Sequence, residues 1–335
     1  MMLNIAPVQN AVISSQNKYL DILDAAWQQH LAPRADNAPT VISTFAGAGG
    51  SSLGYSIAGY RELLAVEWDN NAVETFKLNF PDVPVYHSDI AMLSVEQCMD
   101  MAGIAIGELD VLDGSPPCQG FSTAGKRVFD DPRNELFREY VRLLRGLQPK
   151  VFVMENVSGM VKGKMKLIFV DILRELKASG YQVKACLMNA MYFNVPQSRQ
   201  RMIFIGVRED LGIAPSHPKA ESRSFGIEDA IPELRGKRVN WCMYPGMVFD
   251  GVRPWHTSKE PAPTLSKSGN TAIEIASKML RNFTGYECQR LASFPDRFGF
   301  LGDDSDKVAR IGNSVPPLFL KAIALHIRQE ILAKI

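Results

Sequence analysis

The sequence predicts an α/β protein with a doubly wound, mostly parallel sheet and a small irregular inserted domain. From residue 40 onward, apolar runs of strand length alternate with segments of helical periodicity, the order that builds parallel sheets. The runs are continuous rather than alternating, which is typical of strands buried on both faces. The first run also leads directly into a glycine-rich turn, a common feature of open α/β folds. The 335 residues are 46% apolar and 22% charged, the composition of an ordinary globular protein.

The first expected element is a helix over 15–31, in which apolar side chains recur at helical spacing, and the segment PRADNAPT, 33–40, forms a linker. Strands are expected at 40–45, 63–68, 109–114, 150–157, 181–188 and 201–207. Helices are expected from residue 51, at 136–147 and at 164–178.

The rhythm breaks after residue 207, and 209–278 is rich in proline without a helical period. Helices return at 286–294, with Thr284 as a cap, and from Pro317, since proline suits the first helical turn. The expected parts are an N-terminal helical extension (1–39), a catalytic and cofactor domain (40–208), the inserted domain (209–278) and a C-terminal part that returns to the catalytic domain (279–335).

Charge and cysteine content narrow the cellular setting. Basic and acidic side chains nearly balance, 37 against 36, so net charge alone argues mildly against a nucleic-acid partner. No apolar stretch is long enough for a membrane span, and the N-terminus lacks the pattern of a secretory signal. Five cysteines without a CxxC pair predict neither a disulfide framework nor a zinc site. We therefore expect a cytoplasmic protein without a metal.

The glycine-rich turn FAGAGG, which begins at Phe45, follows the first strand and precedes a helix. Gly47 and Gly49 would let the backbone turn sharply and approach a ligand at the helix N-terminus. The dinucleotide pattern GxGxxG is not met, because Ser52 stands where the third glycine should be. The turn by itself is equally consistent with a tight turn that binds nothing.

Acidic and aromatic residues after the next strands favour a ligand. Glu67 lies twenty residues after Gly47 and can accept hydrogen bonds from ribose hydroxyls. Trp68 offers a flat face for adenine, although a core tryptophan is the default interpretation, and Asp89 could meet the adenine amino group. These residues predict a nucleoside-bearing cofactor without a strong pyrophosphate site.

The segment SPPCQGFS, 115–122, places a cysteine on a loop at the carboxyl end of a strand. Pro116 and Pro117 stiffen that loop, so Cys118 would be accessible and aimed, as a nucleophile must be. A purely structural cysteine is the alternative, which the flanking prolines and glycine disfavour.

Two further polar groups end apolar strands. Glu155 follows a buried run and can act as an acid near neutral pH, while Asn156 or Ser158 could instead cap a helix. In QSRQR, Arg199 and Arg201 alternate and would point to one face, where they need anionic or carbonyl partners. The alternative for this pair is a solvated edge.

These elements together resemble the cytosine-5 DNA methyltransferases, from Val41 to the C-terminal helix. The motifs that carry the resemblance occur in the family's order: FAGAGG, EWD, SDI, PPCQGFS, ENV, QSRQR, RNFTGYECQRLASFPDRF and GNSVPP. One departure is Ser43-Thr44, where the family often has Asp-Leu before the phenylalanine. The resemblance implies a Rossmann-like methyltransferase that uses S-adenosyl-L-methionine.

The resemblance also implies a role for individual residues. Cys118 matches the nucleophile, Glu155 the acid that contacts nitrogen 3 of the cytosine, and Arg201 the residue that reaches its oxygen 2. Other matches near the base are Arg199, a neighbour in the same polar shell, and Asn156 and Gln119, which shape or cover a catalytic loop spanning Gly114 to about Asn134. The implied cofactor contacts are Phe45, Gly47, Gly49, Glu67, Trp68, Asp89, Ile90, Pro117, Leu136 and Asn313.

By the same resemblance, the substrate is a cytosine flipped out of double-stranded DNA and 209–278 is the target-recognition domain. Its excess of basic residues is small, so binding would depend on local groups such as Arg235–Arg238. A monomer is expected, with a cognate restriction endonuclease as a candidate partner. The alternatives are a tRNA cytosine-5 methyltransferase and a catalytically inactive DNA-binding relative; a nicotinamide dehydrogenase is disfavoured by the missing third glycine.

Overall fold

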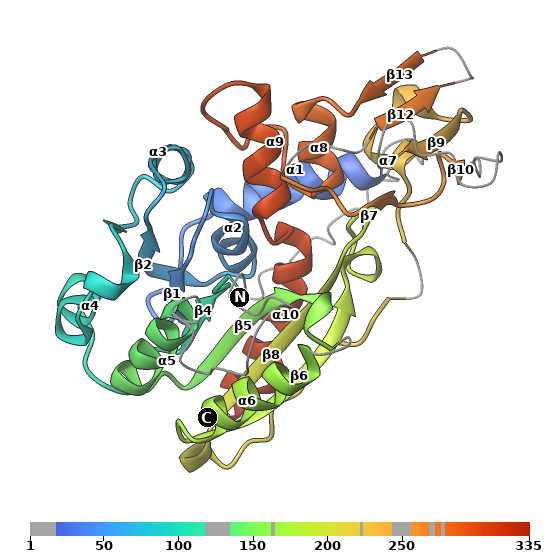
Figure 1. Ribbon diagram of the computed structural model, residues 1–335. Helices are drawn as coiled ribbons and strands as arrows, with labels where there is room; N and C mark the ends of the chain where they lie inside the picture. Colours follow the sequence, from blue (N-terminus) through green and yellow to red (C-terminus); the bar gives the residue numbers. More distant parts are fainter. Residues whose placement is uncertain are drawn as a thin grey trace, which may run out of the picture.

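One seven-stranded sheet organises the protein (Figure 1). The computed structural model describes residues 18–117, 135–161, 165–221, 224–242, 256–267, 272–275 and 279–335. The strand order is β3-β2-β1-β4-β5-β8-β6. The strands are β1 (Thr40–Thr44), β2 (Arg61–Glu67), β3 (Val85–His87), β4 (Val111–Gly114), β5 (Val151–Val157), β6 (Tyr181–Asn189) and β8 (Gln200–Arg208).

The sheet is mostly parallel, which confirms the predicted fold class. Strands β3, β2, β1, β4 and β5 all pair in parallel, whereas β8 is antiparallel to both of its neighbours, β5 and β6. The link from β6 to β8 holds only a short 3-10 turn and the two-residue strand β7 (Gln197–Ser198). A link this short suits antiparallel neighbours, because a parallel connection needs a longer crossover.

Helices cover both faces of the sheet (Figure 1). On one face lie α4 (Val95–Ala102), α5 (Glu135–Leu147) and α6 (Met165–Lys177). On the other lie α2 (Gly50–Ile57), α3 (Asn70–Asn79) and α10 (Pro317–Glu330). Burial on both faces explains the continuous apolar runs: Val41 joins the core under α2 and α10, and its neighbour Ile42 joins the core under α5.

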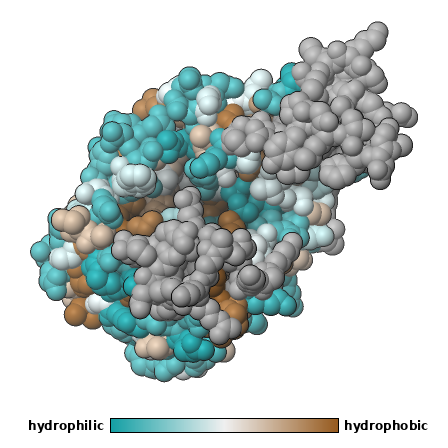
Figure 2. Space-filling view, in the orientation of Figure 1, coloured by the Kyte–Doolittle hydropathy of each residue, from teal (hydrophilic) through white to brown (hydrophobic). Residues whose placement is uncertain are grey.

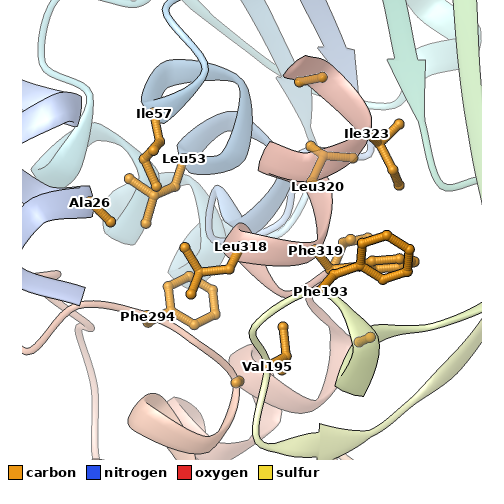
Figure 3. Packing of buried hydrophobic residues seen from close by; sticks show 14 of the residues in the cluster. Ala26, Leu53, Ile57, Phe193, Val195, Phe294, Leu318, Phe319, Leu320 and Ile323 are labelled. Carbon is orange, nitrogen blue, oxygen red and sulfur yellow. The ribbon is translucent and has the colours of Figure 1, made fainter. Parts of the chain in front are cut away.

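The N-terminal helix α1 (Lys18–Leu31) belongs to the same core. Tyr19, Leu23 and Ala26 are buried, and Ala26 points toward Leu53 and Ile57 of α2 (Figure 3). The helix also contacts α7 (Ile227–Ala230), which lies far along the chain. The predicted amphipathic helix is therefore confirmed from Lys18 onward.

Part of the inserted segment forms a separate four-stranded sheet with the order β10-β9-β12-β13. Its strands are β9 (Arg238–Cys242), β10 (His256–Thr257), β12 (Ala272–Ile275) and β13 (Met279–Asn282). The short strand β11 (Ala262–Pro263) instead pairs with β7 of the catalytic body. Helices α8 (Gly285–Leu291) and α9 (Asp304–Asn313) follow, and Thr284 caps α8 as predicted. Strand β13 lies beyond residue 278, and the domain boundaries stay a prediction.

Candidate active site and family membership

The glycine-rich turn leaves the carboxyl end of β1 with an unusual backbone. Phe45 has a φ of 56°, a left-handed conformation that is costly for a side chain of this size. Gly47 and Gly49 also have positive φ, 56° and 95°, and Gly49 is the N-cap of α2. A Cβ at Gly49 would overlap the ring of Phe80, so this position requires glycine. Backbone strain of this kind gathers where a ligand is bound.

Glu67, at the end of β2, fixes this turn to the next loop. Its Oε2 accepts a hydrogen bond from the Gly47 amide at 2.8 Å, and its Oε1 accepts from the amides of Trp68 and Asp69, each at 2.9 Å. A carboxylate offers about four lone pairs, so Oε2 retains one for a further donor. Glu67 thus lies against the glycine turn, and its predicted contact with ribose hydroxyls stays a prediction.

Trp68 is 75% exposed at the carboxyl edge of the sheet. The interpretation of this residue as a core tryptophan is therefore wrong, because the loop after β2 turns the indole away from the core. An exposed indole beside a strained glycine turn is available for stacking on an aromatic ligand.

The loop after β3 supplies the next group. Asp89 is exposed, and its Oδ1 accepts a hydrogen bond from the Ala91 amide at 2.9 Å, which starts a single 3-10 turn. Ile90 is buried. Arg142 of α5 donates to the carbonyl oxygens of Ile90 and Leu93, at 3.0 and 2.7 Å, and so holds both sides of that turn.

The other predicted cofactor contacts come from three more elements. Pro117 is exposed after β4, Leu136 is half-buried in the first turn of α5, and Asn313 is exposed at the end of α9. The face of the molecule seen in Figure 2 is mostly hydrophilic where it is coloured, with hydrophobic side chains in scattered groups. The groups after β1, β2, β3 and β4 share the carboxyl edge of the sheet, where open α/β sheets bind ligands.

Glu155, close to the carboxyl end of β5, forms an ion pair with Arg201 of β8. The distance from Glu155 Oε1 to Arg201 Nε is 2.6 Å, and the two side chains are only 13% and 14% exposed. The antiparallel register brings them together, because Arg201 pairs with Val157, two residues beyond Glu155. Strand β8 therefore places the guanidinium of Arg201 beside the carboxylate of Glu155, near the carboxyl end of β5.

The residues just before the predicted nucleophile Cys118 are bonded to the same strand, β5. The Nδ2 of Asn156 donates to the carbonyl oxygen of Pro116 at 3.1 Å, and its Oδ1 accepts from the Val157 amide. Asn156 is buried in β5. The predicted residues Cys118 and Gln119 lie outside the described residues.

Arg199 has a different environment from Arg201. It is 2% exposed, and its guanidinium donates to the carbonyl oxygens of Leu265 and Gly312, at 3.0 and 2.8 Å. The solvated-edge alternative is therefore wrong for this residue. Burial, reinforced by the neighbouring Arg201, lowers the pKa of Arg199 to about 9. Its contacts join β7 and β8 to the inserted segment and to α9, and its place around the base stays a prediction.

Within the part of the chain that the structure describes, no three His, Cys, Asp or Glu side chains group as metal ligands would. The described helices likewise include none long and apolar enough to cross a bilayer.

Comparisons with known proteins agree with this arrangement. The family model of the C-5 cytosine-specific DNA methylases matches residues 39–240 and 235–329. The chain belongs to this family. As a member it is a DNA cytosine-5 methyltransferase, an enzyme that methylates carbon 5 of cytosine in DNA.

Relatives of similar length support this membership. The Type II methyltransferase M1.HphI of Haemophilus parahaemolyticus is 36% identical over 85% of this chain and 85% of its own length. M.DdeI of Desulfomicrobium norvegicum is 32% identical over 86% and 88%, respectively. M.NgoPII of Neisseria gonorrhoeae is 30% identical over 90% and 99%.

Solved structures show the same fold. A putative DNA modification methyltransferase from an Escherichia coli prophage superposes with a TM-score of 0.69, at 24% identity, over 88% of this chain and all of that one. Dnmt2 of Spodoptera frugiperda superposes with a TM-score of 0.63, at 19% identity, over 87% and 99%.

Sequence reasoning missed several polar residues that support the site. Arg142 and Arg310 hold the loops after β3 and β2, and Asp113 is buried in β4 beneath the glycine turn. Arg142 and Arg310 lie in helices among other charged residues, so only the fold distinguishes them. Asp113 is one of two aspartates in the run LDVLDG, and the sequence does not show which of them is buried.

Proposed function

We propose that this methyltransferase takes its methyl group from S-adenosyl-L-methionine held at the carboxyl ends of β1 to β4. Three observations support the fit: the strained turn at Phe45, the remaining lone pair on Glu67 and the exposed indole of Trp68. The cofactor, when bound, supplies an electrophilic methyl group on a sulfonium sulfur. The residues proposed to hold it are Phe45, Gly47, Gly49, Glu67, Trp68, Asp89, Ile90, Pro117, Leu136 and Asn313.

The observation that carries the catalytic part of the proposal is the Glu155–Arg201 pair. It lies at the same edge of the sheet, on the strand that also anchors the loop leading to Cys118. Arg201 can donate to oxygen 2 of a cytosine while Glu155 donates a proton at nitrogen 3. Two such contacts on one edge would orient the ring and disperse charge as it develops.

Cys118 then performs the covalent step. Carbon 5 of cytosine is too weak a nucleophile to be methylated directly, so the thiolate adds to carbon 6 and the electron pair of the ring double bond becomes available at carbon 5. Carbon 5 accepts the methyl group as the bond from that methyl to sulfur breaks, with its electron pair left on the sulfur. A base then removes the carbon 5 proton, the returning electron pair expels the thiolate, and the nitrogen 3 proton returns to Glu155. The ring is restored with a methyl group in place of one hydrogen.

Asn156 and Gln119 act in this proposal by shaping or covering the loop around Cys118. The contact from Asn156 to Pro116, two residues before the cysteine, supports that role. Arg199 is assigned to the polar shell behind Arg201, because the carboxylate of Glu155 lies near enough to stabilise its charge.

The DNA substrate in this proposal is double-stranded. A cytosine stacked in the duplex cannot receive a thiolate above its ring, so it would have to be flipped out. The segment 209–278 would recognise the target sequence, and Arg235 and Lys237, both exposed, could contact phosphates. The Type II relatives suggest a restriction-modification setting with a cognate endonuclease. We also propose that the enzyme acts as a cytoplasmic monomer.

Methylation itself tests the catalytic assignment. The chain and its Cys118→Ala variant are expressed in a methylation-deficient host, and 5-methylcytosine in hydrolysed DNA is quantified by mass spectrometry. We expect product from the chain and background from the variant. Equal product in both samples would eliminate Cys118 as the nucleophile, and background in both would contradict activity. Bisulfite sequencing of the same DNA would identify the target.

Cofactor binding is tested separately. S-adenosyl-L-methionine should quench the fluorescence of Trp68, and Trp68→Ala should bind it more weakly in calorimetry. Unchanged affinity in the variant would contradict the stacking role. The substitution should leave the packing of the core intact, because the indole of Trp68 is exposed.

A further inference from the structure

Two of the proposed cofactor contacts come from parts of the chain that are far apart in sequence. Trp68 lies on the loop after β2, and Asn313 ends α9. Both side chains are exposed, so their own packing does little to fix their positions. The relative position of the two groups must therefore be set by contacts between the loop and the helix that carry them.

Arg310 of α9 makes those contacts. Its Nη2 lies 2.9 Å from Oδ1 of Asp69, and its Nε donates to Oδ1 of Asn71 at 3.0 Å. Asn71 in turn donates to the carbonyl oxygen of Leu301 at 3.1 Å. One guanidinium thus holds the last residue of the loop, Asp69, and the first turn of α3 against the C-terminal part of the chain.

The residues that Arg310 joins are next to the proposed cofactor contacts in the sequence. Asp69 immediately follows Trp68, and Arg310 lies one helical turn before Asn313. Glu67 fixes the backbone of the loop, because it accepts hydrogen bonds from the amides of Trp68 and Asp69. Arg310 adds a contact from α9 to the side chain of Asp69, and so fixes the loop relative to that helix.

Helix α9 is itself held in place at both ends. Its first turn has a capping box formed by Asp303 and Asp306, and Asp304 accepts from the Gly285 amide. Its last turn receives the buried guanidinium of Arg199 at the Gly312 carbonyl oxygen, a favourable place for a cation. A loop that is bonded to this helix is therefore held in a fixed position.

An ordinary surface ion pair is the competing explanation. Such pairs contribute little to stability, and one without a positioning role would leave cofactor binding unchanged. Arg310, however, is only 20% exposed, Asp69 is 35% exposed, and the guanidinium uses separate nitrogens for acceptors on two residues. The fixed fork of arginine suits this geometry, which a lysine could satisfy only in part.

We propose that Arg310 is a positioning residue, which sets the spacing between Trp68 and Asn313 and thereby the affinity for S-adenosyl-L-methionine. This inference rests on the proposed cofactor site. Arg310 itself touches no reacting atom. Its removal should weaken cofactor binding through the loop and leave the chemistry at Cys118 and Glu155 unchanged.

The experiment measures KM for S-adenosyl-L-methionine, kcat with saturating DNA, and Trp68 quenching. The variants are Arg310→Ala, Arg310→Lys, Asp69→Asn and the double variant Arg310→Ala/Asp69→Asn. Asparagine keeps the N-cap of α3, which the Asp69 carboxylate now provides, so only the ion pair is removed. Arg208→Ala is the matched control, because Arg208 also pairs with an aspartate and is 19% exposed, at the opposite edge of the sheet.

We expect Arg310→Ala to raise KM about three- to tenfold, as for a binding group that has lost its support, with kcat within about twofold of the parent. The KM of Arg310→Lys should lie between those of the parent and Arg310→Ala. The KM of the double variant should be no higher than that of Arg310→Ala. Arg208→Ala should change neither constant. A parent chain that fails to bind the cofactor would refute the proposed function. A parent that binds while Arg310→Ala has an unchanged KM, or additive effects in the double variant, would refute the positioning role alone.

Discussion

Replacement of Asp113 by asparagine should reduce the dependence of stability on pH. Asp113 lies in β4, 3% exposed, and the hydroxyl of Tyr55 donates to its Oδ1 at 3.2 Å. Burial raises the pKa of this carboxyl to about 8, and the nearby Glu62 adds to the shift. Burial also raises the pKa of Glu62 to about 7, and its Oε2 has no hydrogen-bond partner among the described residues. The folded enzyme therefore holds protons on acids that the unfolded chain releases near pH 4.

The sign and size of the effect follow from this difference. Above about pH 4 the unfolded carboxyls are ionised while the folded ones remain protonated, so a rise in pH favours unfolding. Each proton costs about 1.4 kcal/mol per pH unit until the folded group ionises. For Asp113, the loss between about pH 6 and pH 7.5 is therefore about 2 kcal/mol. Asparagine cannot ionise and still accepts from Tyr55, so Asp113→Asn should remove this part of the slope.

The assay is urea unfolding of the parent, Asp113→Asn, Glu62→Gln and the double variant, at pH values from about 5.5 to 8.5. Asp36→Asn, at an exposed position, is the control for the change of charge. The slope should fall in each single variant and fall further in the double variant, because each acid holds a proton that the unfolded chain releases. Parallel stability curves for the parent and Asp113→Asn would refute the reasoning.

Three further predictions concern other parts of the molecule. Burial lowers the pKa of His217, so the folded state stays neutral where the unfolded chain gains a proton; stability should fall as pH drops below about 6.5, and His217→Gln should show a smaller loss in acid unfolding. A Cβ at Gly206 would overlap the Phe152 ring, so Gly206→Ala should cost about 1–3 kcal/mol in urea unfolding, and a smaller loss would mean that the ring can move. Asn156→Ala removes the bond to Pro116; kcat should fall while KM for the cofactor changes little, and an unchanged kcat would count against this anchor.

The sequence predicts the strands well because burial on both faces leaves a visible apolar run. It cannot show that β8 runs antiparallel to β5, since an apolar run such as that of 201–207 carries no direction. Helix α9 is also invisible to apolar periodicity, because its sequence DSDKVARIGN is mostly polar and partly exposed. Its capping box is the local signal that could have located it.

The site divides in a similar way. Glu67, Glu155 and Arg201 could be anticipated because each adjoins the end of an apolar run, which the fold brings to one edge. Arg310 could not, since its partner Asn71 is 239 residues away. Arg199 shares its motif with Arg201 but donates to two carbonyl oxygens, and no sequence pattern identifies a carbonyl partner. Contacts between distant segments are a property of the tertiary structure.

Helix α1 has a practical consequence for work on this enzyme. The match to the family begins at residue 39, after the helix ends, yet Tyr19, Leu23 and Ala26 complete the core beside α2. A chain shortened to the family boundary would present apolar side chains of α2 to water, a surface prone to self-association. The folded unit is therefore longer than the segment that matches the family, and α1 has to be included when the enzyme is expressed.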